Sequence, residues 1–429
     1  MNTKIFVVLL TGLSLTANVF AQRSGSESAF RPRVVGSSET AKADPTPTPT
    51  PRSVVVISSA TPFPRSTTKP TPKPSPRRVI TSNARPQPRV GTLRYSEIKS
   101  KIEEAKRAMR TRPLKISSYD PVQTTSIVRL AFYDRNTRNL DYVVISKKDF
   151  LTKDSNLLAK SESRKFVRIR TIRGNGVNTP VMIFDSYNRA HVPLLVQYPI
   201  EKFGRFREMS YYVSTHPGIV TAETSNAGRM YVRNILDIAR QKLRAKGIFI
   251  QPKVTDIAER LALVEHVDHY RFRTEYHPRI YNDIYTLYAL NQGQTYRYSV
   301  SRAGAGGMVQ MIPATYRMIR SRYYRVGLMP DFVAGMRDHV NAAQAMLLYM
   351  QMTWNDMTAN STISKAMYNG IATQEQLMAA GYNSNPARIP KYIRRGGAGW
   401  TRLIPRETKV YLKIYKSVEQ HVPLRPRSR

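Results

Sequence analysis

The residue of this sequence best placed for acid–base chemistry is Glu265, which directly follows the apolar run 261–264. This run continues the apolar stripe that Ile257 begins at helical spacing, so we expect a helix that ends at Glu265. A carboxyl group shielded by apolar neighbours has a raised pKa, because burial disfavours its charged form. Such a group holds a proton near neutral pH and can deliver it to a poor leaving group. We therefore expect Glu265 to be a general acid.

Two further segments combine small residues with polar ones. Residues 298–315 read Tyr-Ser-Val-Ser-Arg-Ala-Gly-Ala-Gly-Gly-Met-Val-Gln-Met-Ile-Pro-Ala-Thr, and residues 379–386 read Ala-Ala-Gly-Tyr-Asn-Ser-Asn-Pro. Pro405, Thr408 and Tyr411 follow the second of them. Glycines allow a ligand to approach the backbone closely, although tight connections between helices need them as well.

Together and in this order, the three segments resemble the lytic transglycosylases of glycoside hydrolase family 23, whose fold is similar to goose-type lysozyme. That family has a helix ending in a catalytic Glu, then a Ser-x-x-Gly-Ala-x-Gly-Leu-Met-Gln motif, then Ala-Tyr-Asn, and often Pro-x-x-Thr-x-x-Tyr. The resemblance covers residues 250–420. It implies that Glu265 alone cleaves the β-1,4 bond between N-acetylmuramic acid and N-acetylglucosamine in peptidoglycan, leaving 1,6-anhydro ends without using water.

The resemblance also implies a set of substrate-binding residues. They are Ser301, Gly304, Ala305, Gly307, Met308, Gln310, Tyr382 and Asn383. Ser301 and Gln310 would hold the Glu265 loop and contact the sugar at the cleavage site. The Tyr382 hydroxyl would orient the catalytic carboxyl, and Asn383 would serve as a structural amide. For the glycines, a role in a tight helix connection is the alternative.

The spacing departs from the family pattern, because Glu265 and Ser301 are 36 positions apart. The shorter spacing usual in the family would place Gln292 at the catalytic position. An amide cannot donate a proton as an acid does, so the domain would then be an inactive peptidoglycan-binding pseudoenzyme. We favour an insertion between His269 and Asn291, helical and basic in composition. The apolar run before Glu265 matches the family signature, and the residues around Gln292 read as a loop.

Three other ambiguities remain at the level of sequence. Tyr368 precedes an asparagine and could take the place of Tyr382, which we favour because of the residues after it. A muramidase that uses water is the enzymatic alternative, and it usually employs a second carboxylate. Glu265, His266 and His269 lie within one helical turn, but their spacing matches no common zinc motif, so we expect no metal and no cofactor.

The elements expected around these residues define an α+β multidomain protein. Short β-branched and aromatic runs predict strands at 124–133, 141–145, 165–172, 180–185, 192–198 and 209–215. Apolar residues at spacings of three and four predict helices at 91–110, 229–245, from Thr255 or Asp256 to 264, and at 279–289, 313–323, 341–354 and 374–380. We thus expect a small β-rich module at 96–220 and an α-helical, lysozyme-like domain at 221–424.

The N-terminal sequence and the net charge indicate the compartment in which the protein acts and the charge of its partners. An apolar stretch in 5–15 and a small residue at Ala21 predict a cleaved secretory signal at 1–21, and repeated Pro and Thr predict a disordered linker at 22–95. We expect an exported protein of the periplasm or cell envelope, with no transmembrane segment after signal cleavage. The 68 basic and 29 acidic residues give a formal charge of +39, and Cys is absent. Such charge suits anionic envelope polymers beside the peptidoglycan strands, and export makes nucleic acid an unsuitable partner.

Overall fold

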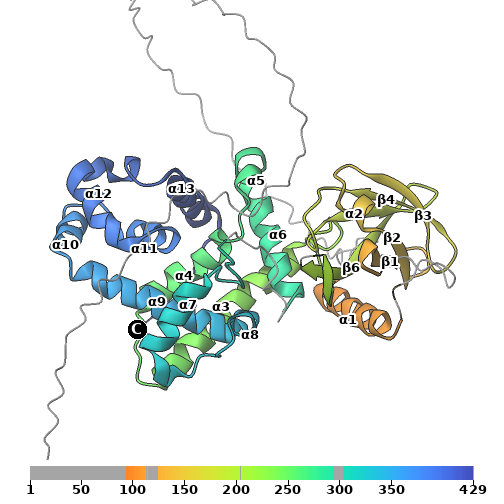
Figure 1. The fold of residues 1–429 in the computed structure, drawn as a ribbon. Helices are drawn as coiled ribbons and strands as arrows, with labels where there is room; N and C mark the ends of the chain where they lie inside the picture. Colours follow the sequence, from red (N-terminus) through yellow and green to blue (C-terminus); the bar gives the residue numbers. More distant parts are fainter. Residues whose placement is uncertain (1–92, 113, 115–123, 203, 293–302, 429) are drawn as a thin grey trace, which may run out of the picture. The chain divides into compact units, whose positions relative to one another are not determined.

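The computed structural model describes residues 93–112, 114, 124–202, 204–292 and 303–428, which belong to one compact unit (Figure 1). The signal peptide at 1–21, almost all of the linker at 22–95, and Ser301 lie outside the described residues. The described part is mixed α+β, an antiparallel sheet followed by a helical C-terminal region, as expected from the sequence patterns. None of its helices has the length and apolar character needed to cross a bilayer.

The first half of the described chain forms an antiparallel sheet. Its strands are β1 (Ile127–Asp134), β2 (Asn139–Ser146), β3 (Asn156–Lys160), β4 (Phe166–Thr171), β5 (Val181–Phe184), β6 (Ala190–Lys202) and β7 (Arg205–Tyr212). They follow the spatial order β2-β1-β6-β5-β4-β3, and β7 pairs with β6. The short β3 was not expected, because Asn156–Lys160 is neither strongly apolar nor β-branched and buries none of its side chains completely.

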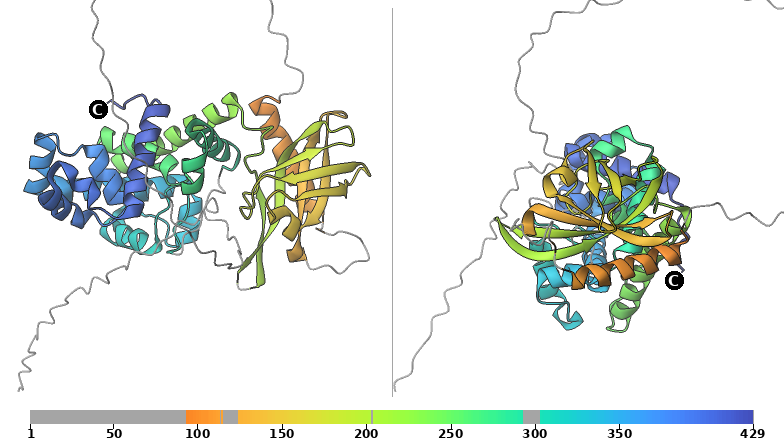
Figure 2. Two further views of the ribbon diagram at one scale, coloured as in Figure 1. Left: turned by 90° about the horizontal axis from the view of Figure 1, so that it is seen from above. Right: turned by 90° about the vertical axis from the view of Figure 1, so that its right-hand side faces the viewer.

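The two faces of the sheet are covered differently. Helix α1 (Tyr95–Thr111) lies across one face (Figure 2), where its Ile98, Ile102 and Met109 form a core cluster with residues of β1, β2 and β6. The other face carries the alternating apolar residues of all the central strands, and α2 (Lys147–Leu151) adds Phe150 to them. Because α1 reaches only β1, β2 and β6, we define the same face of β3, β4 and β5 as the outer face of the sheet edge.

Helices make up the second half of the described chain. They are α3 (Ala222–Arg244), α4 (Pro252–Val264), α5 (His269–Thr274), α6 (His277–Leu290), α7 (Pro313–Arg322), α8 (Phe332–Arg337), α9 (His339–Thr358), α10 (Ser361–Tyr368), α11 (Gln374–Asn383), α12 (Ile389–Gly396) and α13 (Arg406–His421). Short 3-10 turns lie at Thr124–Ser126, Tyr324–Val326, Pro386–Arg388 and Gly397–Arg402. Helices α5 and α6 occupy the region between His269 and Asn291, which confirms that this region is helical.

The start of α4 differs from the expectation. Thr255 and Asp256 do not cap the helix; they lie inside it and are buried, and the helix begins at Pro252. Proline suits the first position of a helix, where its fixed φ is helical and its missing N–H costs no hydrogen bond. Ten of the thirteen residues of α4 are buried, so this helix lies in the core, and Glu265 follows directly at its C-terminal end.

Candidate active site

Glu265 lies where α4 ends and is half-buried. Its backbone has φ −61° and ψ −19°, and its N–H still donates to the carbonyl of Leu261, so the residue closes the last helical turn. The Tyr411 hydroxyl, from α13, donates a hydrogen bond to Glu265 Oε1 at 2.5 Å. Tyr411 is itself only 3% exposed, so it holds the carboxyl from the interior side.

Burial raises the pKa of the Glu265 carboxyl to about 8. The hydrogen bond from Tyr411 acts in the opposite direction, because it stabilises the carboxylate, and the nearby charge of Glu407 raises the pKa further. Desolvation is the largest of the three influences. Glu265 is therefore protonated at neutral pH, which is the state required of a general acid.

The residue after Glu265 joins α4 to the glycine-rich segment. His266 is buried, and its Nε2 lies 3.1 Å from the carbonyl oxygen of Met308. The Tyr288 hydroxyl, from α6, lies 2.7 Å from the Ala262 carbonyl oxygen and 3.2 Å from that of Met308. Burial lowers the pKa of His266 to about 4, so the ring is neutral and serves as a structural bridge. The segment resembling the family motif is thus fixed beside the end of α4.

The glycine-rich segment turns tightly through left-handed backbone conformations. Gly304 has φ +74° and Gly307 φ +72°, and Gln310 has φ +45°, which costs a residue with a side chain conformational energy. A Cβ at Gly307 would lie 2.7 Å from the backbone carbonyl oxygen of Met336. Gly307 therefore permits close packing between this segment and α8, which supports its structural interpretation.

The predicted substrate contacts in this segment are partly corrected. Met308 is completely buried and belongs to the core, and Ala305 is 7% exposed. The Met308 side chain is therefore not available to contact a glycan, whereas the expected role of Ala305 stays a prediction. Gly304 and Gln310 are half-buried, and Gln310 Nε2 donates to the Gly307 carbonyl oxygen at 3.0 Å. Ser301 lies outside the described residues, so its expected role stays a prediction.

The structure places the hydroxyl of Tyr411, and not that of Tyr382 as expected, on the Glu265 carboxyl. The Tyr382 hydroxyl, at the end of α11, donates to the carbonyl oxygen of Val309 at 2.6 Å. Tyr382 therefore positions the glycine-rich segment, and it is Tyr411 that bonds to Glu265. The sequence analysis named both Tyr382 and Tyr411, but their spacing could not show which hydroxyl reaches the carboxyl of Glu265. Asn383 Oδ1 accepts a hydrogen bond from Thr408 at 2.9 Å, which agrees with a structural amide joining α11 to α13.

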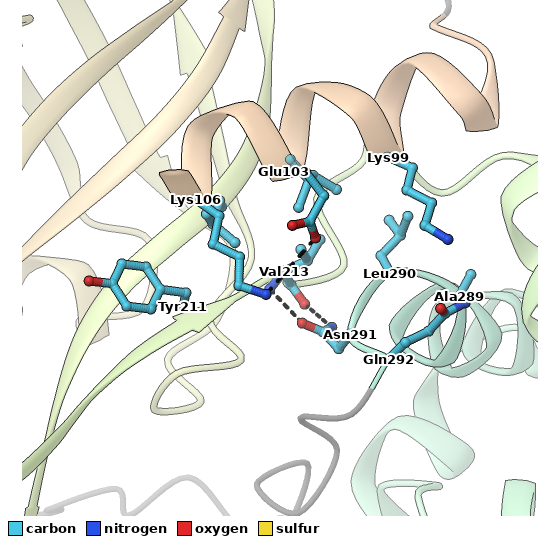
Figure 3. A pocket seen from close by; sticks show the side chains of 11 residues that line it. Lys99, Glu103, Lys106, Tyr211, Val213, Ala289, Leu290, Asn291 and Gln292 are labelled. Carbon is cyan, nitrogen blue, oxygen red and sulfur yellow. Dashed lines mark hydrogen bonds and ion pairs between the residues drawn. The ribbon is translucent and has the colours of Figure 1, made fainter. Parts of the chain in front are cut away.

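The alternative tyrosine and the alternative catalytic position lie elsewhere. Tyr368 ends α10 and is 93% exposed. Gln292 follows α6 and lines a small cavity of about 50 Å³ together with Lys99 and Lys106 of α1 (Figure 3). Glu265, by contrast, adjoins both the glycine-rich segment and Tyr411, so the geometry favours Glu265 over Gln292.

Sequence reasoning missed a second acidic residue near Glu265. Glu407, in the first turn of α13, is half-buried, and its charge raises the pKa of Glu265. It also acts on His269 at the start of α5, where it raises the pKa that burial lowers. In the sequence, Glu407 lies between Pro405 and Thr408, which follow the 379–386 segment and match the Pro-x-x-Thr pattern of the family. This position was the signal that could have pointed to Glu407.

The Glu265–His266–His269 hypothesis of a metal site has no geometric support, because His266 turns into the core toward Met308 while Glu265 meets Tyr411. Within the described residues, no group of three or more His, Cys, Asp or Glu could hold a metal ion. A second cavity, of about 230 Å³, lies between α3, α6 and the end of α13, lined by Arg229 and His421 among others, and Glu265 does not line it.

Neither the models of known protein families, nor curated proteins, nor solved structures match this chain. The resemblance of the three segments to the family 23 transglycosylases therefore stays a prediction that the geometry must support by itself.

Proposed function

We propose that this protein is a lytic transglycosylase that cleaves peptidoglycan glycan strands, with Glu265 as its catalytic acid. The observation that carries the proposal is the carboxyl of Glu265, held by Tyr411 at the end of a buried helix with a pKa of about 8. The glycine-rich segment fixed beside it carries the half-buried Gln310 and Gly304, which are the remaining described candidates for contact with the sugar. The helical C-terminal region would then be a lysozyme-like domain, and the chain would act in the periplasm or cell envelope.

In the proposed reaction, Glu265 gives its proton to the oxygen of the β-1,4 bond as the bond from that oxygen to C1 of N-acetylmuramic acid breaks. The glutamate, now a carboxylate, takes the proton of the C6 hydroxyl of the same sugar. The C6 oxygen bonds to C1 and closes a 1,6-anhydro ring, so the proton balance is zero and no water is consumed. General acid–base assistance of this kind accelerates a reaction by about a hundred- to ten-thousand-fold.

The position of Glu407 favours a second candidate, a muramidase that uses water. Hydrolysing glycosidases usually work with two carboxyl groups, and Glu407 is the carboxylate whose charge acts on Glu265. In that reaction, water would attack C1 in place of the C6 hydroxyl. The two candidates differ in their product, an anhydro end or a reducing end.

Digestion of purified peptidoglycan by the mature chain and by Glu265→Gln, with the products weighed by mass spectrometry, tests the proposal. We expect anhydro-ended muropeptides from the parent and a rate at least about a hundredfold lower from the variant. Reducing ends would assign the chain to the muramidases. An inactive parent that still binds the wall would support the pseudoenzyme, and a fully active Glu265→Gln variant would exclude Glu265 as the acid.

A further inference from the structure

The outer face of the sheet edge, on β3, β4 and β5, is open where α1 does not cover the sheet. Cross-strand register places its side chains in three rows. The rows are Lys160 with Phe166, then Leu158 with Arg168 and Phe184, then Asn156 with Arg170 and Met182. The intervening residues of β4, Val167 and Ile169, point to the opposite side and are buried in the core.

The composition of this outer face is unusual for a solvated surface. Among its eight described positions, three are cationic, four are apolar and none is acidic. Leu158 is 66% exposed and Phe166 is 58% exposed. Single exposed apolar residues are normal, but two large ones in adjacent rows of one strand pair indicate an interaction surface.

The cations of this region lie over aromatic rings. Lys160 Nζ is 6.0 Å from the ring centre of Phe166, and Arg168 Cζ is 4.5 Å from that of Phe184. In the adjoining turn Arg189 lies 5.0 Å from the ring centre of Tyr187, which is 78% exposed. These three pairs form a basic and aromatic surface at one corner of the sheet.

The acidic residues that border this surface are engaged by basic ones. Asp185 receives hydrogen bonds from Arg189 and from Asn136. Glu162, in the turn between β3 and β4, pairs with Arg112 and Arg129. Asp154, just before β3, lies 3.9 Å from Arg170, and the side chains of both residues are more than half exposed. Exposed pairs of this kind contribute little. The positive charge of Lys160, and most of that of Arg170, is therefore left to face an external anion.

We propose that the outer face of the sheet edge is a second binding surface for peptidoglycan, separate from the Glu265 site. A glycan strand offers sugar rings, whose apolar faces suit exposed aromatic and aliphatic side chains, and stem peptides with carboxylates for Lys160, Arg168 and Arg170. This assignment of the occupant rests on the proposed function, because the same compact unit carries Glu265. The surface would keep the enzyme on the wall between cleavage events.

The test is sedimentation of the mature full chain with purified peptidoglycan sacculi, carried out with Glu265→Gln so that the polymer stays intact. Lys160→Gln with Arg170→Gln removes two exposed charges from the face. Lys242→Gln with Arg244→Gln removes the same two charges from an exposed stretch of α3 and is the matched control. We expect the first pair to weaken binding roughly three- to tenfold and to flatten its salt dependence, and the control to change it less than twofold.

The double variant Phe166→Ser/Leu158→Ser tests the contribution of the apolar side chains. We expect it to weaken binding to the sacculi without changing the salt dependence of that binding. Blocking the sacculus carboxylates should abolish the difference between Lys160→Gln/Arg170→Gln and the control. Equal binding of the face and control variants overturns the inference, as does tighter binding of DNA or anionic lipid vesicles through the same residues. Cleavage of short soluble glycan fragments by the corresponding variants that retain Glu265 measures the proposed function separately, and we expect it to be unchanged.

Discussion

The hydrogen bond between Tyr411 and Glu265 sets both the position and the proton affinity of the carboxyl group. Tyr411→Phe removes this bond and keeps the ring, so we expect the carboxyl to lose its fixed orientation while the core stays packed. Misplacement of a catalytic group by about 1 Å costs roughly a hundredfold in rate. We therefore predict a 10- to 100-fold lower kcat with KM little changed, measured as release of muropeptides.

Tyr368→Phe is the matched control, because this tyrosine is 93% exposed at the end of α10. It should cut at the parent rate. An equal loss in both variants, or no loss in Tyr411→Phe, would contradict the role given to Tyr411.

The pKa of Glu265, raised by burial to about 8, predicts how the rate depends on pH. The acid acts only while protonated, so the rate should fall as pH rises through about 8. Glu407→Gln removes a negative charge that favours the protonated form. We predict that the alkaline limb of the kcat/KM profile then moves to lower pH.

Glu419→Gln is the control for that shift, since Glu419 stands twelve residues further along α13, about 18 Å by helix geometry. Its profile should coincide with that of the parent. A limb that stays in place in Glu407→Gln would show that Glu407 does not act on Glu265.

At this scale, the sequence predicted the position of Glu265 at the end of an apolar helix better than it predicted the residues that contact it. Glu265 was identified because an apolar run before a carboxylate is visible in one dimension. The bond from Tyr411 to Glu265 is not visible in this way, because it depends on how α11 and α13 pack around the end of α4. Met308 was assigned to the substrate for the same reason: a motif position does not reveal which side of a turn is buried.

At the scale of elements, periodicity located most of the long helices and most strands. It missed α13 (Arg406–His421), which carries Tyr411 and Glu407, and it failed where the pattern is weak. The first turns of α3 read Ala-Glu-Thr-Ser-Asn-Ala-Gly, so the apolar stripe predicted a start at Arg229. The helix begins at Ala222 because the Thr221 side chain caps it. A Cβ at Gly228 would lie 1.8 Å from the Tyr285 carbonyl oxygen, so this glycine allows the close contact of α3 with α6.

The segment after α13 ties α3 to α4 through Arg427, whose side chain is only 4% exposed. Its guanidinium pairs with Asp237 at 2.6 Å, Asp256 at 2.9 Å and Glu259 at 2.7 Å. Arg427→Gln leaves Asp256 and Glu259 buried with less compensating charge. Breaking a buried pair from one side costs about 3–5 kcal/mol, so we predict a loss of that order in the free energy of unfolding at pH 7.

Denaturant unfolding measures this loss, and Arg425→Gln, on an exposed neighbour, should change the free energy of unfolding by less than about 0.5 kcal/mol. Burial raises the pKa of Glu259, so this acid is protonated early as the pH falls. The deficit of Arg427→Gln should therefore shrink in acid, because protonation removes the uncompensated charge of Glu259. A deficit independent of pH would mean that lost packing, and not charge, is the cause.

At the scale of the whole described chain, the sheet and the helices share one compact unit, and the side chain of Asn291 connects them at the end of α6. Asn291 Oδ1 accepts from the N–H of Val213 at 2.8 Å, and its Nδ2 donates to the carbonyl oxygen of the same residue at 2.7 Å (Figure 3). The amide thus takes the place of a neighbouring strand just beyond β7. The sequence suggested only a loop at this position, because the pairing joins residues 78 positions apart.

Asn291→Ala leaves the buried N–H and carbonyl of Val213 without these bonds, at about 1–3 kcal/mol for each group. We predict that the free energy of unfolding falls by roughly 2–4 kcal/mol, whereas Asn282→Ala, on the exposed side of the same helix, changes it little.

Both tryptophans, Trp354 and Trp400, lie in the helical region, so their fluorescence reports the unfolding of the helices. Hydrogen exchange of the strand amides reports the unfolding of the sheet. If the two regions are coupled through Asn291, both signals move to the same lower denaturant concentration. A fall in strand protection with unchanged tryptophan fluorescence would show that the helical region is stable without the sheet, and that Asn291 stabilises the sheet alone.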